Sequence, residues 1–147
     1  MFERTGSRAD PTWARAGTPP EATWGIRVPG EAWAVGLVRG ALRVWLGTVG
    51  WSGAPADEVL TAAVEALVHA VQHTHPTRVE GGPLVLEARV VPGVRTRRVE
   101  IVLSPGGAAS ADELPELVGG LVAEVEVVPN GGPAWDTRVV LRSHPDP

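Results

Sequence analysis

The chain of 147 residues contains no cysteine and no lysine. Without cysteine, disulfides and thiolate metal sites are excluded, and the sequence does not indicate whether the protein works in an oxidising or a reducing compartment. All 13 basic residues are arginine, which excludes a lysine nucleophile, a Schiff base and the lysine of a phosphate-binding loop. The formal net charge of -4 gives no indication of a nucleic-acid partner held through phosphate contacts.

Long apolar runs are also missing. No segment approaches the roughly 20 residues that span a bilayer, and no apolar stretch follows the first charges as in a secretory signal. We therefore expect a cytoplasmic protein with no membrane partner. The length and a hydrophobic fraction of 44% fit one globular domain with its own core. Aperiodic residues 1–22 are expected to form a flexible tail, residues 23–143 the domain, and residues 144–147 a second tail.

The segment Ala56–His75 has the clearest periodicity and is predicted to be an amphipathic helix. Pro55 favours a helix start, and Pro76 ends the helix because its ring cannot join the next turn. One face of this helix is apolar and is formed by Leu60, Ala63, Val64, Leu67, Val68 and Val71. The opposite face is polar and carries, one turn apart, Glu65, His69 and His73. The apolar face requires a sheet or another helix beneath it.

Alternating apolar residues and turn signals predict the remaining elements. Strands are expected at residues 23–28, 84–91, 98–103, 123–128 and 137–141, and further helices at residues 31–49 and 111–122. The strands at 84–91 and 98–103 form a hairpin whose tip carries Arg95, Arg97 and Arg98, interpreted as a solvated turn or, less simply, a small-anion contact. This order predicts an α+β two-layer sandwich with helices on one face of a mixed, mostly antiparallel sheet.

Three segments carry a resemblance to a known family. The central helix reads Glu65-Ala-Leu-Val-His69-Ala-Val-Gln-His73, close to the pattern E-x-x-x-N-A-x-x-H. Leu117 to Val127 and the closing Thr137 to Leu141 follow in the matching order and spacing. The chain thus resembles the GHKL, or histidine-kinase-like, ATPase domain with the Bergerat fold. It is most similar to the anti-sigma-factor serine kinases common in actinobacteria.

The resemblance implies a nucleotide pocket with altered residues. In the family, the helix asparagine holds Mg²⁺, the preceding glutamate is the general base, and a D-x-G carboxylate binds adenine. Here Glu65 and His73 match, His69 stands at the asparagine position, and Ser104-Pro105-Gly106 stands at D-x-G. The vestigial pocket would be lined by His69, His73, Ser104, Gly106 and Thr137.

Further replacements oppose nucleotide binding. Histidine is a poor Mg²⁺ ligand because that ion prefers hard oxygen donors. Glu113 and Glu116 place negative charge where the family's second glycine motif would cradle phosphate, and Asp136 replaces the glycine before Thr137. We therefore expect the fold to be kept while most ATP affinity and catalysis are lost. No cofactor is expected. ATP and Mg²⁺ would be the cofactors, and Glu65 the general base, only if the site still functions.

The resemblance implies partners of a particular kind: a sigma factor, an anti-anti-sigma (STAS) protein, or both, with the chain as a homodimer or paired with a paralogue. The expected function is that of an anti-sigma-factor-like regulator acting by protein binding in a partner-switching circuit. One alternative is an active serine/threonine kinase that phosphorylates an anti-anti-sigma factor. Another is a metal-binding or scaffold protein paired with an intact paralogue. In that case Glu65, His69 and His73 are the candidate metal ligands, since two histidines four residues apart on a helix can bind zinc.

Overall fold

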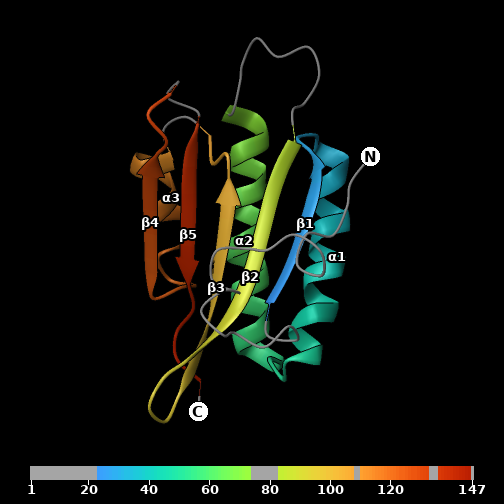
Figure 1. Cartoon of the computed structure of the whole chain (residues 1–147), viewed down its shortest axis with the longest axis vertical. Coiled ribbons are helices and arrows are strands. Elements are labelled where there is room, and N and C mark those ends of the chain that lie inside the picture. The colour runs from blue at the N-terminus through green and yellow to red at the C-terminus, as the bar shows by residue number, and fades with distance from the viewer. Residues whose placement is uncertain (1–22, 74–82, 108–109, 133–135, 147) are drawn as a thin grey trace.

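A computed structural model of the chain describes residues 23–73, 83–107, 110–132 and 136–146 (Figure 1). The predicted tail at residues 1–22 lies outside these ranges. The elements follow in the order β1 (Thr23–Pro29), α1 (Ala32–Thr48), α2 (Gly53–His73), β2 (Pro83–Pro92), β3 (Arg97–Ser104), α3 (Ser110–Val118), β4 (Glu124–Pro129) and β5 (Thr137–Arg142).

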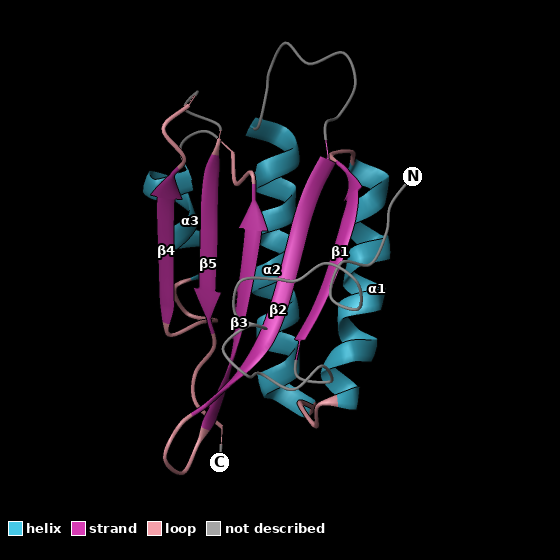
Figure 2. Ribbon diagram, in the orientation of Figure 1, coloured by secondary structure: helices cyan, strands magenta, loops and turns pink. Residues whose placement is uncertain are grey.

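The described strands form one five-stranded sheet in the order β1-β2-β3-β5-β4. All four pairings between these strands are antiparallel. The helices lie together on one face of the sheet, with α2 between α1 and α3 (Figure 2). The predicted α+β two-layer sandwich is therefore confirmed. Among the described helices, none combines the length and apolarity needed to cross a bilayer.

Alternation along the strands creates the core between the two layers. Successive side chains of a strand point to opposite faces of the sheet, so every second residue meets the helices. Strand pairing aligns Leu86 with Leu103 and Ala88 with Ile101, and Leu141 continues the second row on β5. All five side chains are buried. The apolar alternation in the sequence thus translates directly into a continuous apolar layer.

The buried face of α2 differs in part from the predicted one. Leu60, Ala63 and Leu67 are buried as predicted, but Val64 and Val68 are only half-buried. Three alanines that the pattern leaves out of the apolar face are fully buried: Ala62, Ala66 and Ala70. The reason is that α2 packs against α1 and α3 as well as against the sheet, so its buried surface is wider than one stripe and is displaced around the helix.

Arg97 connects the β2–β3 hairpin to the turn that joins α1 and α2. Its guanidinium donates to the carbonyl oxygens of Val49 at 2.6 Å and Gly50 at 3.0 Å, and its Cζ lies 5.1 Å from the ring centroid of Trp51. These carbonyls belong to the C-terminal end of α1, where a positive charge is favourable. Arg97 therefore has a structural role, whereas Arg95 at the same tip is exposed as predicted.

The C-terminal end is ordered by pairing rather than being a free polar tail. Arg97 and Asp146 exchange two backbone hydrogen bonds of 2.9 Å each. Ser143 is buried, and its backbone N–H donates to the Val99 carbonyl oxygen at 2.9 Å while its Oγ accepts from the Val99 N–H at 2.8 Å. Backbone pairing with β3 therefore continues beyond the expected boundary at residue 143, as far as Asp146.

The face of the sheet opposite the helices carries a row of charged side chains. Strand pairing places Arg89, Glu100, Arg142 and Glu124 side by side on β2, β3, β5 and β4. Glu100 Oε1 accepts from Arg89 Nε at 2.9 Å, and its Oε2 accepts from Arg142 Nε at 2.9 Å. Arg142 also donates to Glu124 at 3.1 Å and Glu126 at 3.0 Å. The row therefore links four strands by charge-assisted hydrogen bonds.

Glu87 lies on this outer face without a charged neighbour in the strand pairing, and replacing it by glutamine is expected to stabilise the protein at neutral pH. Its partners across the ladders are Gly25 and Val102. Burial raises the pKa of the Glu87 carboxyl above 4.5 because the charged form is poorly solvated. The ionised carboxylate therefore costs stability once the pH exceeds the folded-state pKa, and protonation restores that stability as the pH falls.

The measurement is the melting temperature of Glu87→Gln and of the parent protein between pH 4 and 8. We expect the variant to melt higher at pH 7 and the difference to vanish as the pH approaches the ordinary value of 4.5. Glu116→Gln, at an exposed position of α3, is the matched control and should show no such trend. A gain that is independent of pH would contradict the assignment.

Candidate functional site

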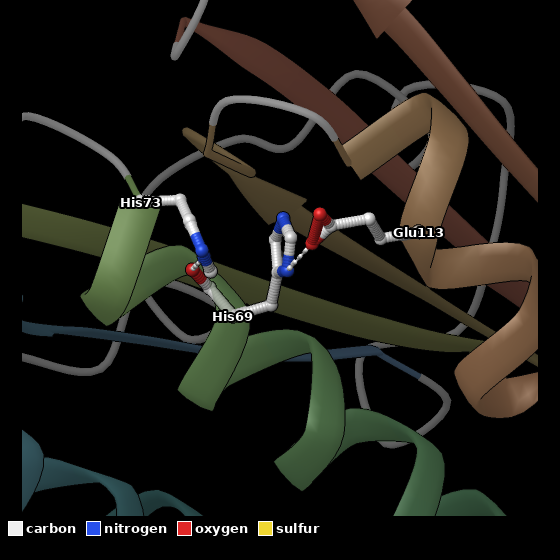
Figure 3. A group of neighbouring side chains, drawn as sticks. All are labelled: His69, His73 and Glu113. Atoms are coloured by element: carbon white, nitrogen blue, oxygen red, sulfur yellow. Dashed lines mark hydrogen bonds and ion pairs between the residues drawn. The ribbon is translucent and has the colours of Figure 1, made fainter.

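Two helices bring three potential metal-binding side chains close together. His69 and His73 come from the last two turns of α2, and Glu113 comes from the first turn of α3. One donor atom from each lies within 4.8 Å of the other two, and Figure 3 shows the His69 ring between His73 and the Glu113 carboxylate. Among the described residues, this is the group of histidine and acidic side chains whose geometry suits a metal ion. We refer to it as the His-His-Glu cluster.

His69 is the buried member of the cluster. It is 4% exposed, because α2 is covered on this side by α3, whereas the side chain of Glu113 is half-exposed. His69 Nδ1 lies 3.7 Å from Glu113 Oε1, which is within ion-pair range but longer than a good hydrogen bond. The sequence pattern places His69 on the polar face of the helix. The structure corrects this to a buried position at the α2–α3 contact.

The second histidine is oriented by the first. His73 Nδ1 lies 3.0 Å from the carbonyl oxygen of His69, and because a carbonyl only accepts, Nδ1 must carry the hydrogen. In the neutral imidazole the lone pair then resides on Nε2. The two rings stack with their centroids 4.3 Å apart at an interplanar angle of 28°. A backbone contact thus selects the tautomer and fixes the ring of His73.

The loop after β3 packs against this end of α2 and against the start of β5. The Gly106 N–H donates to the Thr137 carbonyl oxygen at 2.8 Å, and Thr137 Oγ1 lies 3.4 Å from the Gly107 carbonyl oxygen. Gly107 has φ +95°, and a Cβ there would lie 3.2 Å from Cα of Ala70 and 3.4 Å from Cβ of His73. Only glycine combines this backbone conformation with so close an approach.

The structure brings most of the predicted pocket residues together. His69, His73, Gly106 and Thr137 meet around the C-terminal end of α2, and Ser104 ends the adjacent strand β3. Glu65 is half-buried one turn before His69 and is not part of the His-His-Glu cluster.

The His-His-Glu cluster differs in one member from the metal set of Glu65, His69 and His73 expected from the sequence. Four helical residues correspond to a rise of about 6 Å, so Glu65 lies on the far side of His69 from His73. Glu113 supplies the carboxylate instead. The sequence signal for it is an acidic pair, Asp112 and Glu113, in the first turn of the helix that follows a glycine-rich loop.

The donor chemistry of the cluster does not fit Mg²⁺ and a triphosphate. Mg²⁺ favours octahedral oxygen ligands and keeps several waters, whereas here two of three donors are imidazole nitrogens. The Glu113 carboxylate would also repel phosphate oxygens brought close to His69. Asp136 accepts a hydrogen bond from Asn130 Nδ2 at 3.1 Å.

Two cavities lined by described residues lie elsewhere in the molecule. One, of about 410 Å³, lies between α1 and β1 and is lined by Trp24, Ile26, Leu37, Ala41, Val44, Trp45 and Thr48. The other, of about 220 Å³, lies beside Trp51 and the C-terminal residues. Next to the first cavity, α1 exposes three large apolar side chains: Trp33, Leu37 and Val44. Neither cavity includes a residue of the His-His-Glu cluster.

Comparisons with known proteins show the fold. No protein-family model matches the chain, and no curated protein matches it. The structure is similar to a crystal structure of the RsbU and RsbW domains of Rv1364c from Mycobacterium tuberculosis, with a TM-score of 0.59 and 23% sequence identity. The match covers 84% of this chain and 33% of the crystallised chain, so this chain spans about one third of that chain's length. The similarity supports the GHKL-like fold expected from the sequence.

Proposed function

We propose that this protein is an anti-sigma-factor-like regulator that acts by binding a protein partner in a partner-switching circuit and has lost effective ATP binding. The partner would be a sigma factor or an anti-anti-sigma (STAS) protein. The observation that carries the proposal is the Glu113 carboxylate, 3.7 Å from the histidine at the position where the family has its Mg²⁺-binding asparagine. A regulator of this fold without nucleotide chemistry has to act through contacts with another protein.

The surface of α1 supports a protein-binding role. Trp33, Leu37 and Val44 are exposed on one helix beside an apolar cavity of about 410 Å³. Exposed apolar patches of this kind mark interaction sites on soluble domains, and tryptophan is enriched among the residues that contribute most to binding. The fold similarity to a structure that contains an RsbW domain gives the partner its proposed class.

The proposal is tested by two measurements on the full chain. In isothermal titration calorimetry with Mg²⁺–ATP we expect no binding in the low-micromolar range. In co-purification from the native cells we expect a sigma factor or STAS protein to be retained equally with and without ATP. Low-micromolar ATP binding, or transfer of phosphate to the retained protein, would establish the active-kinase alternative instead.

His69→Asn provides a sharper nucleotide test because it recreates the family residue at one position only. We expect this variant not to regain ATP binding, since Glu113 still opposes phosphate and Ser104 still lacks the adenine-binding carboxylate. The double variant His69→Asn, Glu113→Gln removes the repulsive charge as well. Restoration of tight ATP binding by His69→Asn alone would show that the remaining pocket is intact and would refute the proposal.

A further inference from the structure

We propose that His69, His73 and Glu113 bind a divalent transition-metal ion, with Zn²⁺ as the ion that fits the ligands best. The site joins the C-terminal end of α2 to the first turn of α3 (Figure 3). It requires neither a nucleotide nor a protein partner. The metal proposal and the proposed function can therefore fail independently.

The ligand types favour Zn²⁺ over the hard cations. Two imidazoles and one carboxylate form the His₂Glu set that zinc accepts with a further position left for water or another ligand. Imidazole also suits Ni²⁺, Co²⁺ and Cu²⁺, whereas Mg²⁺ and Ca²⁺ favour oxygen-only sets. The spacing of His69 and His73, four residues apart on one helix, is a recurring arrangement for two metal ligands.

One ring already presents a nitrogen lone pair for ligation, whereas the two stacked rings must turn apart before both lone pairs face one ion. The hydrogen bond from His73 Nδ1 to the His69 carbonyl oxygen leaves the lone pair on Nε2, and this kind of contact orients metal-binding histidines. His69 is held by burial at the α2–α3 contact. The tautomer of His73 is thus already selected, which lowers part of the ordering cost of binding an ion.

The donor distances and the stacked rings both require adjustment before the three side chains share one ion. Two donors bound to one tetrahedral Zn²⁺ at the usual bond lengths lie about 3.3 Å apart. His69 Nδ1 and Glu113 Oε1 are 3.7 Å apart, and all three donors lie within 4.8 Å of one another. The half-exposed Glu113 side chain can move toward the histidines by rotation about its own bonds, without displacing the core. The carboxylate also supplies the negative charge that a dication requires.

The experiment uses the full chain after removal of any purification tag and of bound metal with a chelator. Zn²⁺ is titrated by calorimetry, and the melting temperature is recorded with and without Zn²⁺. At a Zn²⁺ concentration 100 times the dissociation constant, we expect the melting temperature to rise by about 5–10 °C. Co²⁺ replaces Zn²⁺ in a third measurement, in which visible absorption reports the coordination geometry. Mg²⁺ at the same concentration should have no effect.

Variants assign the ligands. His73→Gln and Glu113→Gln, at positions that are not fully buried, should each weaken Zn²⁺ binding at least tenfold and abolish the Co²⁺ spectrum. His144→Gln and Glu116→Gln are matched controls at exposed positions outside the cluster and should bind as the parent does. Absence of Zn²⁺ binding by the folded parent would overturn the proposal, and so would unchanged affinity in both ligand variants.

Discussion

Glu100→Ala is expected to lower the free energy of unfolding by about 2–4 kcal/mol. Glu100 is the central carboxylate of the outer-face row, and each of its two oxygens accepts a 2.9 Å hydrogen bond from a different arginine. Its side chain is 11% exposed. Truncation removes both hydrogen bonds and the negative charge between Arg89 and Arg142, and removing one partner of a partly buried ion pair costs more than the pair itself contributes.

The pKa of Arg142 also depends on the carboxylates of this row. Burial alone would lower the pKa of its guanidinium, but hydrogen bonds and charge from Glu126 and Glu100 outweigh burial and raise it. Arg142 keeps its hydrogen bonds to Glu124 and Glu126 when Glu100 is removed, which limits the loss on the β5 side of the row. The arginine side chains are nearly one-third exposed, so we place the expected cost below that of a fully buried pair.

Chemical denaturation at pH 7 measures this effect. Glu100→Gln keeps the size of the side chain but loses the charge and one acceptor oxygen, so it should fall between the parent and the alanine variant. Glu124→Gln is the control, because the Glu124 side chain is exposed and a surface pair contributes at most about 1 kcal/mol. Equal losses of stability in Glu100→Ala and Glu124→Gln would show that the hydrogen bonds of Glu100 to Arg89 and Arg142 contribute no more than an exposed ion pair.

The sequence predicted the fold because its local signals agree with each other. The β2–β3 hairpin shows clean alternation bounded by turn residues, and the α2 segment has a helical period ended by proline. Each of these patterns can be recognised within a single helix or hairpin, without knowing how the elements pack together. The position of His69 could not be read this way, because its burial results from α3, a helix that is separate in sequence and that packs over the end of α2.

In the candidate site too, contacts within one element could be predicted from local patterns, whereas contacts between elements could not. His69 and His73 were predictable as neighbours because they share a helix face, and Gly106 and Thr137 because the resemblance assigned both to one pocket. Glu113 was predictable as a charge near the phosphate position but not as a ligand, because its distance to His69 depends on how α3 approaches α2. The role of Arg97 was hidden for the same reason: its partners, Val49 and Gly50, lie almost 50 residues earlier, at sequence separations of 48 and 47.

Gly106→Ala is expected to destabilise the protein by about 2–3 kcal/mol through overpacking. A Cβ at this position would lie 2.4 Å from Val139 Cγ2 and 2.7 Å from Thr137 Oγ1, both on β5. Neither neighbour can move easily, because both are β-branched, both are buried, and the Gly106 N–H is bonded to the Thr137 carbonyl oxygen. Gly106, which the resemblance aligned with a D-x-G motif, is thus expected to be required for packing of the loop on β5, whether or not a nucleotide binds.

Gly40→Ala is the matched comparison and is expected to act in the opposite direction. Gly40 lies in the exposed middle of α1, and a Cβ there meets nothing within 4 Å. Alanine should therefore stabilise the helix by up to about 1 kcal/mol. The two variants differ from the parent by the same methyl group, so their denaturation midpoints isolate the effect of the surroundings. If Gly106→Ala left stability unchanged, the loop would be free to move away from β5, and the retention of glycine would need an explanation outside packing.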